Sequence, residues 1–178
     1  ISLREAIDAA NRDPGFDTIN FDIPGAGTHT ITLSGALPEL IIDDPVLING
    51  YSESGASVNT LAVGNNANLM IELDGSLTGG GTDGLYLVAG SDGSIIQGLA
   101  INRFAADGIE IDGADNVVVR GNFIGTDING NADFGNLGAG VYLNSGSDFA
   151  TIGGSTFADR NVISGNGLHG VEIVDSIT

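Results

Sequence analysis

The chain has 178 residues, lacks cysteine, and carries 23 acidic against five basic residues, for a formal net charge of −18. The lack of cysteine excludes disulfides and thiol chemistry, and no apolar run in the sequence approaches the 18 residues of a transmembrane helix. The acidic balance excludes nucleic acid as a partner, because phosphates are bound by clustered cations. Insertion into a membrane is not expected either.

The chain opens with a predicted amphipathic helix. Ser2-Leu3-Arg4-Glu5 fits a capping box, with Ser2 as N-cap and Glu5 at the third helical position. The apolar residues of this segment share one face at helical spacing: Leu3, Ala6, Ile7 and Ala10. The segment from Asn11 to Gly15, which contains Pro14, ends the helix. We expect the helix to cover the open end of a β core, where unpaired strand edges would otherwise be exposed.

Short strands of uneven length are predicted next, at Thr18–Ile23, Thr28–Leu33, Glu39–Ile42 and Val46–Ile48. We therefore divide a single domain, 1–178, into a cap helix and turn (1–16), irregular first coils (17–82) and regular coils (83–178). The chain stops in the strand-like segment Val171–Val174, so we expect it to be part of a longer chain.

The regular coils are defined by a repeat. Four stretches align, and they begin at Gly84, Gly108, Gly140 and Gly170, 24, 32 and 30 residues apart. Each of the first three is followed by a Gly/Asp turn and two further apolar stretches. Short apolar stretches separated by turn residues are typical of strands rather than helices. Self-similarity at this period is typical of a solenoid.

Stacked coils place equivalent residues in columns roughly 4.8 Å apart. Two inward columns are predicted, Leu85/Ile109/Val141/Val171 and Leu87/Ile111/Leu143/Ile173. The outward column between them is Tyr86, Glu110, Tyr142 and Glu172. A leucine-rich repeat would need a recurring Leu-x-x-Leu-x-Leu frame, which does not occur. The predicted fold is all-β: a right-handed parallel β-helix (solenoid) with a short N-terminal capping α-helix.

Several segments resemble one family. Ser2–Ile7, Ala10-Asn11 and Asp17–Phe21 resemble the N-terminal motif of bacterial secreted and surface proteins of the CSLREA type, with Ile1 where that motif usually has Cys. Three later stretches are also similar to these proteins: Asp44–Tyr51, Gly121–Asp127 and Arg160–Asn166. The resemblance covers nearly the whole chain. It implies a pectin-lyase-like β-helix within a large exported or surface-attached protein, and it implies no defined activity.

The insertion that lengthens one coil to 32 residues carries a candidate calcium site. Oxygen-bearing side chains alternate along it at Asp127, Asn129, Asn131 and Asp133, like the opening of a calcium loop. Ala132 stands where such a loop has Gly. Two interpretations remain open: a bound calcium ion, or a loop held by its own Asx turns. No other cofactor is required.

Two turn columns are also predicted. Asp92, Asp115 and Asp148 would stack, and their mutual repulsion would be absorbed either by turn amides or by a cation. Asn122 and Asn161 share a column beside an apolar strand and predict a stacked amide ladder.

Two pairs of residues receive no functional role from the sequence. Asp83 and Asp107 precede the repeated glycine, but Ala139 and His169 replace them in later coils, so no functional ladder is predicted there. His29 and His169 are too isolated to suggest a zinc site.

The predicted function is a non-catalytic, extracellular structural or adhesive scaffold of the bacterial cell surface. It would form fibres if solenoid ends stack head to tail, because such a contact does not close. Tyr86 and Tyr142 are the predicted ligand-binding patch for a glycan or a surface protein, or else are ordinary surface β-formers.

The alternative is a polysaccharide-active enzyme (lyase, hydrolase or epimerase) or a glycan-binding β-helix. Glu110 and Glu172 would lie two coils apart, roughly 9.6 Å, near the upper end of the inverting range of glycosidases. The charge of −18 opposes an anionic polymer.

Overall fold

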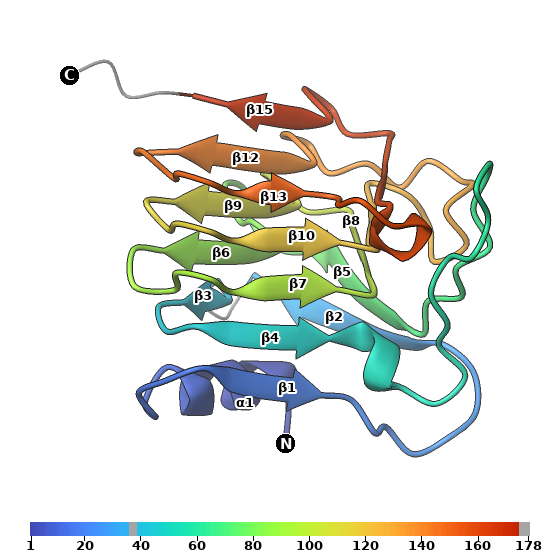
Figure 1. Cartoon of the computed structure of the whole chain (residues 1–178), viewed down its shortest axis with the longest axis horizontal. Helices are drawn as coiled ribbons and strands as arrows, with labels where there is room; N and C mark the ends of the chain where they lie inside the picture. The colour runs from blue at the N-terminus through green and yellow to red at the C-terminus, as the bar shows by residue number, and fades with distance from the viewer. Residues whose placement is uncertain (36–38, 175–178) are drawn as a thin grey trace.

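A computed structural model describes residues 1–35 and 39–174. After helix α1 (Leu3–Ala10), the described chain forms three parallel five-stranded sheets (Figure 1). Sheet A contains β1 (Asp17–Asn20), β4 (Val46–Asn49), β7 (Ile95–Gln97), β10 (Val118–Arg120) and β13 (Thr151–Ile152). Sheet B contains β2 (His29–Ser34), β5 (Ile71–Leu77), β8 (Leu99–Asn102), β11 (Phe123–Ile124) and β14 (Val162–Ile163). Sheet C contains β3 (Ile41–Ile42), β6 (Leu85–Val88), β9 (Ile109–Asp112), β12 (Val141–Asn144) and β15 (Val171–Ile173).

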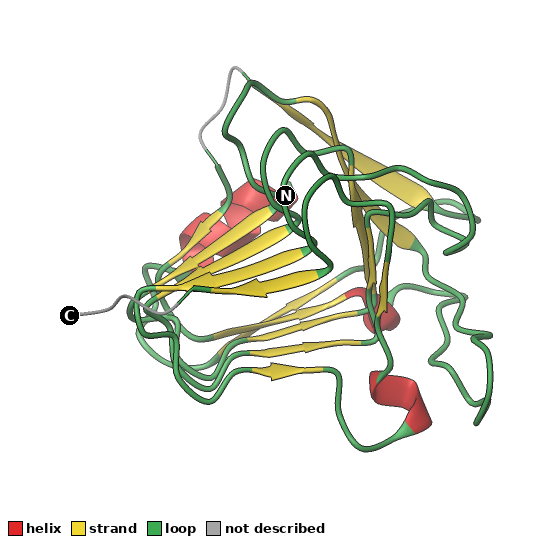
Figure 2. Ribbon diagram, turned by 90° about the horizontal axis from the view of Figure 1, so that it is seen from above, coloured by secondary structure: helices red, strands yellow, loops and turns green. Residues whose placement is uncertain are grey.

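Each coil adds one strand to every sheet in turn, so the neighbours in a sheet are equivalent strands of successive coils. Viewed along the stacking axis, the three sheets surround one core and longer loops project at one side (Figure 2). The predicted parallel β-helix with a short N-terminal helix is confirmed. The end of the predicted last coil, from Asp175 onward, lies outside the described residues.

The predicted columns of sheet C are confirmed by its register. Leu85 pairs with Ile109, Ile109 with Val141, and Val141 with Val171. The outward column is Tyr86, Glu110, Tyr142 and Glu172, as predicted. Side chains alternate along β6, β9 and β12 between buried and partly exposed positions, so one face of each strand builds the core and the other faces outward.

Helix α1 covers the first coil, as its sequence predicts. The Ser2 hydroxyl accepts the backbone N–H of Glu5 (3.2 Å), and the Glu5 carboxylate accepts that of Ser2 (2.8 Å), which completes the capping box. Leu3, Ile7 and Ala10 are buried against the core. No helix in the described part of the chain is long and apolar enough to cross a bilayer.

Side-chain ladders tie the turns of successive coils together. Asp92 accepts the backbone N–H of Asp115, and Asp115 accepts that of Asp148, both at 2.9 Å. The turn amides therefore hold this acidic column, one of the two alternatives left open by the sequence. Asn122 and Asn161 also stack as predicted: Nδ2 of Asn122 donates to Oδ1 of Asn161 at 3.5 Å, and the backbone N–H of Asn122 donates to the same oxygen at 2.9 Å.

The early coils differ in detail from the prediction. The first strand stops at Asn20 instead of Ile23, because side chains take the next backbone donors. The N–H of Phe21 donates to the Ser52 hydroxyl (2.7 Å), and the N–H of Ile23 donates to the Glu53 carboxylate (2.9 Å).

The short 3-10 helix η1 (Gly50–Ser52) leads into a long loop, residues 53–70, that projects from the side of the solenoid. The guanidinium of Arg160 fastens this loop by donating to the carbonyl oxygens of Leu61, Ala62 and Gly64. A second 3-10 helix, η2 (Phe157–Asp159), precedes Arg160 and lies next to the loop.

Candidate functional site: a carboxylate cluster on sheet C

Three carboxyl groups meet at the start of the sheet C strands. Asp83 precedes β6, Asp107 precedes β9, and Glu110 points outward from β9. Their carboxylate oxygens lie within 4.8 Å of one another. Close stacking of the coils is the cause, because a Cβ on Gly84 would lie only 2.4 Å from the carbonyl oxygen of Gly108. Only glycine fits there, and the preceding aspartates are therefore held one above the other.

Backbone donors hold two of the three groups in place. Glu39 accepts the N–H of Asp83 (3.0 Å), Asp83 accepts that of Asp107 (2.6 Å), and Asp107 accepts that of Ala139. Every carboxylate in this ladder thus accepts a bond from the next coil. Glu110 stands outside the ladder and accepts a side-chain bond from Asn144 at 2.8 Å.

The surroundings favour a retained proton. Burial, a hydrogen bond to Glu110 and the charges of Glu110 and Glu39 raise the pKa of Asp83 to about 8, although the N–H of Asp107 acts in the opposite direction. Burial also raises the pKa of Glu110, with the nearby charge of Asp107 adding to the effect. Like charges this close cannot all ionise. The raised pKa values of Asp83 and Glu110 therefore favour one proton retained within the pair at neutral pH.

The cluster has two chemical capacities. The first is to hold a proton in the Asp83–Glu110 pair. The second is to hold a hard divalent cation in the proton's place, since carboxylate oxygens are the ligands that calcium prefers. Asp107, whose pKa is raised by burial and by the charge of Glu172, would be the third ligand.

The two predicted ligand-binding tyrosines lie in the same outward column as Glu110. Glu110 separates Tyr86 from Tyr142, so the rings are two strands apart. The Tyr86 hydroxyl donates to Asp112 (2.8 Å), and this bond, with burial and the surrounding acids, raises the pKa of Tyr86 to about 12. Both rings are partly exposed beside the cluster.

The candidate calcium loop is a small turn closed by an antiparallel bridge between Thr126 and Asp133. The Asp127 carboxylate accepts the backbone N–H groups of Asn131 (2.9 Å) and Ala132 (3.0 Å) and the side-chain amide of Asn129 (2.9 Å). Burial alone would raise the pKa of Asp127, but these donors lower it. The loop's own amides thus occupy Asp127, which favours the Asx-turn interpretation. Calcium binding stays a prediction.

A second group of buried carboxylates, on sheet B, is compensated. Glu72 and Asp74 are buried, and the Arg103 guanidinium reaches both, at 3.4 and 2.9 Å. Arg103 also stacks on the Phe134 ring at 4.4 Å. This ion pair holds the loop around Phe134 against the sheet. The sheet C cluster has no such partner among the cationic groups of the described residues.

The chain was compared with known protein families, with curated proteins and with solved structures, and none of the three comparisons found a match. The resemblance to the CSLREA-type proteins therefore stays a prediction. What the chain does has to be inferred from its own surfaces.

The cluster predicts an unusual dependence of stability on pH. The pKa of Asp83 is higher in the folded chain than in the unfolded chain, where it is near 4. The protonated Asp83 carboxyl therefore contributes fully to the free energy of unfolding below about pH 4, and this contribution is lost as pH rises through about 8. We expect the free energy of unfolding to fall by on the order of 2 kcal/mol between pH 5 and 9, since water at the rim weakens the effect. Urea unfolding at several pH values measures it.

The Asp83→Asn variant should remove this decline. Asn keeps an acceptor for the N–H of Asp107 and donates to Glu110 without needing a proton. Asp92→Asn is the matched control, because it changes a ladder carboxylate outside the cluster, and it should retain the wild-type decline. A decline that persists in Asp83→Asn would contradict the shared proton.

Calcium binding at the loop can be tested by comparing the stability of the wild-type chain and of a loop variant, each measured in calcium and in chelator. We expect Asp127→Ala to lower the free energy of unfolding by about 1–3 kcal/mol, equally in calcium and in chelator, because it removes bonds to the loop's own amides. Asp8→Ala, on the exposed side of α1, is the control. A bound ion with a Kd a hundredfold below the calcium concentration would instead add about 2.7 kcal/mol to the loss in calcium alone.

Proposed function

We propose that the chain is a non-catalytic structural and adhesive scaffold of a protein exposed outside the cell. Its coil stack is a scaffold of fixed geometry that presents side faces to partners. The observation that carries this proposal is the regular stack itself: three parallel five-stranded sheets enclose one core, and their outward columns present aromatic and polar side chains.

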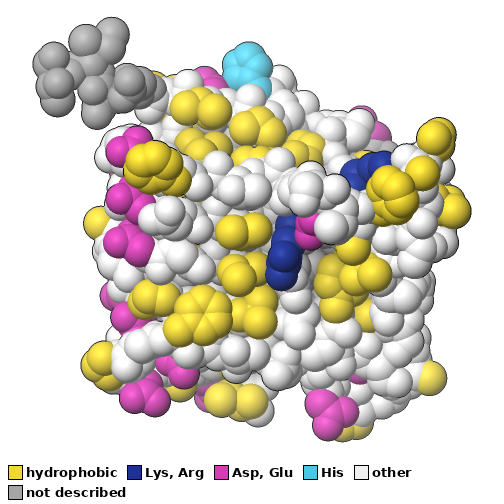
Figure 3. Space-filling model, in the orientation of Figure 1, with side chains coloured by type: hydrophobic (Ala, Val, Ile, Leu, Met, Phe, Trp, Pro, Cys, Tyr) yellow, Lys and Arg dark blue, Asp and Glu magenta, His cyan; other side chains and the backbone are white. Residues whose placement is uncertain are grey.

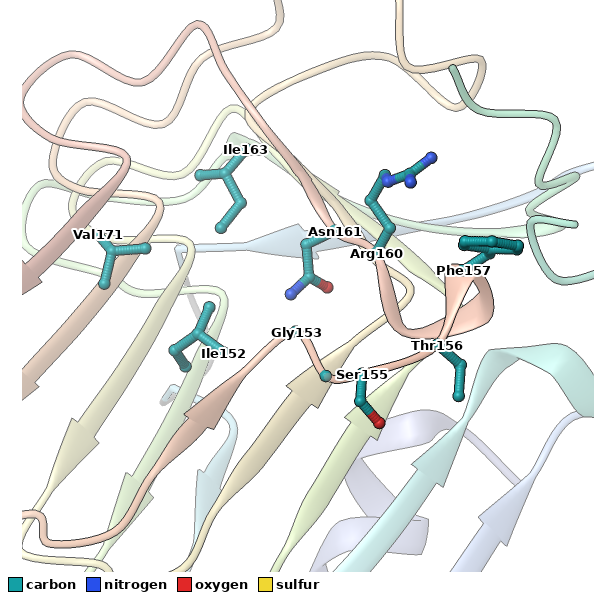
Figure 4. A pocket seen from close by; sticks show the side chains of 10 residues that line it. Ile152, Gly153, Ser155, Thr156, Phe157, Arg160, Asn161, Ile163 and Val171 are labelled. Atoms are coloured by element: carbon teal, nitrogen blue, oxygen red, sulfur yellow. The ribbon is translucent and has the colours of Figure 1, made fainter. Parts of the chain in front are cut away.

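The last described coil has an apolar upper surface. Ile152, Ile163 and Val171 surround a hollow of about 540 Å³ (Figure 4). Val171 and Ile173 occupy inward columns, yet they are 41% and 74% exposed. The edges of β13, β14 and β15 pair on one side only within the described residues. An apolar layer with unpaired strand edges favours packing against a further β layer, which either following coils of a longer chain or a second copy would supply.

The helix-covered end does not offer a matching surface. Leu3, Ile7 and Ala10 point into the core, and Glu5, Asp8 and Ala9 remain exposed. A second copy that approached this end would meet the acidic side chains of α1 beside the edges of β1, β2 and β3, and no exposed inward column among the described residues. In the isolated 178-residue chain, we therefore expect two copies to join through the apolar layer of the last described coil in a closed pair. The head-to-tail fibre expected from the sequence would require α1 to move away.

The side faces supply the adhesive part of the proposal. The outward column of sheet C carries Tyr86 and Tyr142 between acids, and aromatic rings are common anchors of binding surfaces. The charge of −18 favours solubility of such a scaffold in salty, calcium-containing surroundings outside the cell.

A polysaccharide-cleaving enzyme is the second candidate, favoured by the perturbed carboxyl groups, since such groups gather at active sites. Two features rank it lower. The oxygens of Asp83, Asp107 and Glu110 lie within 4.8 Å of one another, closer than the roughly 5–5.5 Å of retaining glycosidases. Asp83 and Asp107 also accept backbone bonds from the neighbouring coil, which gives them a structural role.

Sedimentation velocity at increasing concentration tests the association. We expect the 178-residue chain to pass from monomer to dimer, because the apolar end surface becomes buried between two copies. Val171→Glu should weaken dimerisation by about tenfold or more, since a charge would be placed in the contact. Ile41→Glu is the matched control, because Ile41 is exposed to the same extent as Val171, 41%, but lies on β3 at the opposite edge of the same sheet.

A monomer that persists at all concentrations, or an Ile41→Glu variant that weakens association as much as Val171→Glu, would overturn the contact. Release of reducing sugar or unsaturated uronate that stops in Glu110→Gln would replace the scaffold by the enzyme.

A further inference from the structure

The outer face of sheet A carries a ladder of amide side chains that ends at an arginine. By register, Asn20, Asn49, Gln97 and Arg120 are equivalent positions of four successive coils. Arg120 Nε donates to Gln97 Oε1 (2.9 Å), Gln97 Nε2 to Asn49 Oδ1 (2.9 Å), and Asn49 Nδ2 to Asn20 Oδ1 (3.1 Å). The bonds all run in one direction, so each polarises the next.

This ladder leaves hydrogen-bonding capacity free. A side-chain amide has two N–H donors and a carbonyl with two acceptor sites, and within the ladder Asn49 and Gln97 each use one donor and one acceptor site. Arg120 has five N–H donors, and Nε is bonded to Gln97. Donors and acceptors therefore alternate along the face at strand spacing, roughly 4.8 Å.

A groove of about 350 Å³ lies at the arginine end of the ladder, within the roughly 300–1,000 Å³ of ligand sites. Asn49, Gln97 and Arg120 form its polar side. Tyr51 and Val58, from the segment that follows β4, form its apolar side.

Tyr51, the aromatic side chain of the groove, is held in place by the two coils that follow its own. The Tyr51 hydroxyl donates to the carbonyl oxygen of Gly121 at 2.7 Å. A Cβ on Gly98 would lie 2.8 Å from the Tyr51 ring, and one on Gly121 would lie 2.6 Å from its hydroxyl, so these two glycines make room for the side chain. A preorganised ring loses little conformational freedom when a ligand packs on it.

The charges of the groove cancel. Arg120, 40% exposed, faces the Asp159 carboxylate at 3.7 Å. Hydrogen bonds from the Thr156 hydroxyl and backbone N–H lower the pKa of Asp159, so the pair is ionised and neutral overall. Acidic side chains gather along one edge of this side of the molecule, over the turns between sheets C and A, and few lie over the middle of sheet A (Figure 3).

We propose that this groove and the adjoining amide ladder bind an uncharged glycan that lies along the solenoid axis. Sugar hydroxyls both donate and accept hydrogen bonds. They can therefore pair with the free donors and acceptors of the amides and of the Arg120–Asp159 pair. The apolar C–H face of a sugar ring would pack on Tyr51 and Val58. The site is separate from the Tyr86–Tyr142 patch and from the apolar layer of the last described coil, so the proposal goes beyond the scaffold function and does not depend on association.

Two other kinds of partner fit less well. A peptide would bind a sheet most readily by adding a strand to its edge, but β4, β7 and β10 are inner strands whose backbone groups are already paired on both sides. A polyanion would find Arg120 neutralised by Asp159 on a molecule of charge −18.

Native gel electrophoresis in gels that contain a soluble polysaccharide tests the proposal. The probes are mixed-linkage β-glucan, galactomannan and dextran as uncharged polymers, and polygalacturonate as the anionic one. We expect at least one uncharged polymer to retard the chain, to the same extent at low and high salt, because no net charge is involved.

Arg120→Leu and Gln97→Leu should each weaken this binding by about tenfold, because each removes donors to the ligand. Arg12→Leu is the matched control, an exposed arginine at the other end of the chain, and should bind like wild type. Unchanged circular dichroism and unfolding midpoints establish that the variants are folded. In the wild-type chain, the bound polymer should shift the nuclear magnetic resonance signals of the Gln97 amide and Arg120 Nε–H.

Three results would overturn the proposal. They are no retardation by any uncharged polymer, retardation by polygalacturonate that disappears at high salt, and binding that is lost in Tyr142→Ser but kept in Arg120→Leu. The last result would move the glycan to sheet C and leave the scaffold function intact.

Discussion

In-register stacking of equivalent strands is the constraint on which the rest of the structure depends. Each residue lies above its counterpart in the previous coil, at roughly the 4.8 Å spacing of neighbouring strands. Stacking buries apolar residues against one another, because Leu85, Ile109 and Val141 form one continuous inward column. Acidic residues are brought into mutual repulsion by the same arrangement. The turns resolve it by directing a backbone N–H of the next coil at each carboxylate, as between Asp92 and Asp115.

Where backbone donors do not compensate every carboxylate, the pKa values of the acidic side chains are shifted and a candidate site arises. Asp83 and Asp107 are held by backbone donors, but Glu110 enters the same space from the strand face and adds a third carboxyl. A proton is then retained in place of a counter-charge. On sheet B, Arg103 performs the balancing role for Glu72 and Asp74. The outer face of sheet A is neutral, because amides and one ion pair occupy its polar column. Each of the three sheets thus presents a different surface chemistry.

The features that recur in every coil could be predicted from the sequence. The features that depend on contacts between segments of different sequence could not. The column of Tyr86, Glu110, Tyr142 and Glu172 could be predicted because the strand period is two and the repeat is clear. The carboxylate cluster was set aside because Asp83 and Asp107 do not recur in later coils. The signal was present in Asp107-Gly108-Ile109-Glu110, where Glu110 takes the position that Tyr86 holds one coil earlier. The sheet A groove was not predictable, because its apolar wall comes from Tyr51 and Val58, in a segment outside the repeat.

The most direct test of this account is a carboxyl-carbon nuclear magnetic resonance titration of Asp83, with its signal assigned by its loss in Asp83→Asn. Stacking in register is what brings Asp83 next to Asp107 and Glu110, so the Asp83 carboxyl reports on the stack itself. The account predicts a pKa of about 8 for Asp83 in the folded chain. Titration near 3.8, the ordinary value for an aspartate, would contradict the burial and the like-charge contact that are expected to raise this pKa.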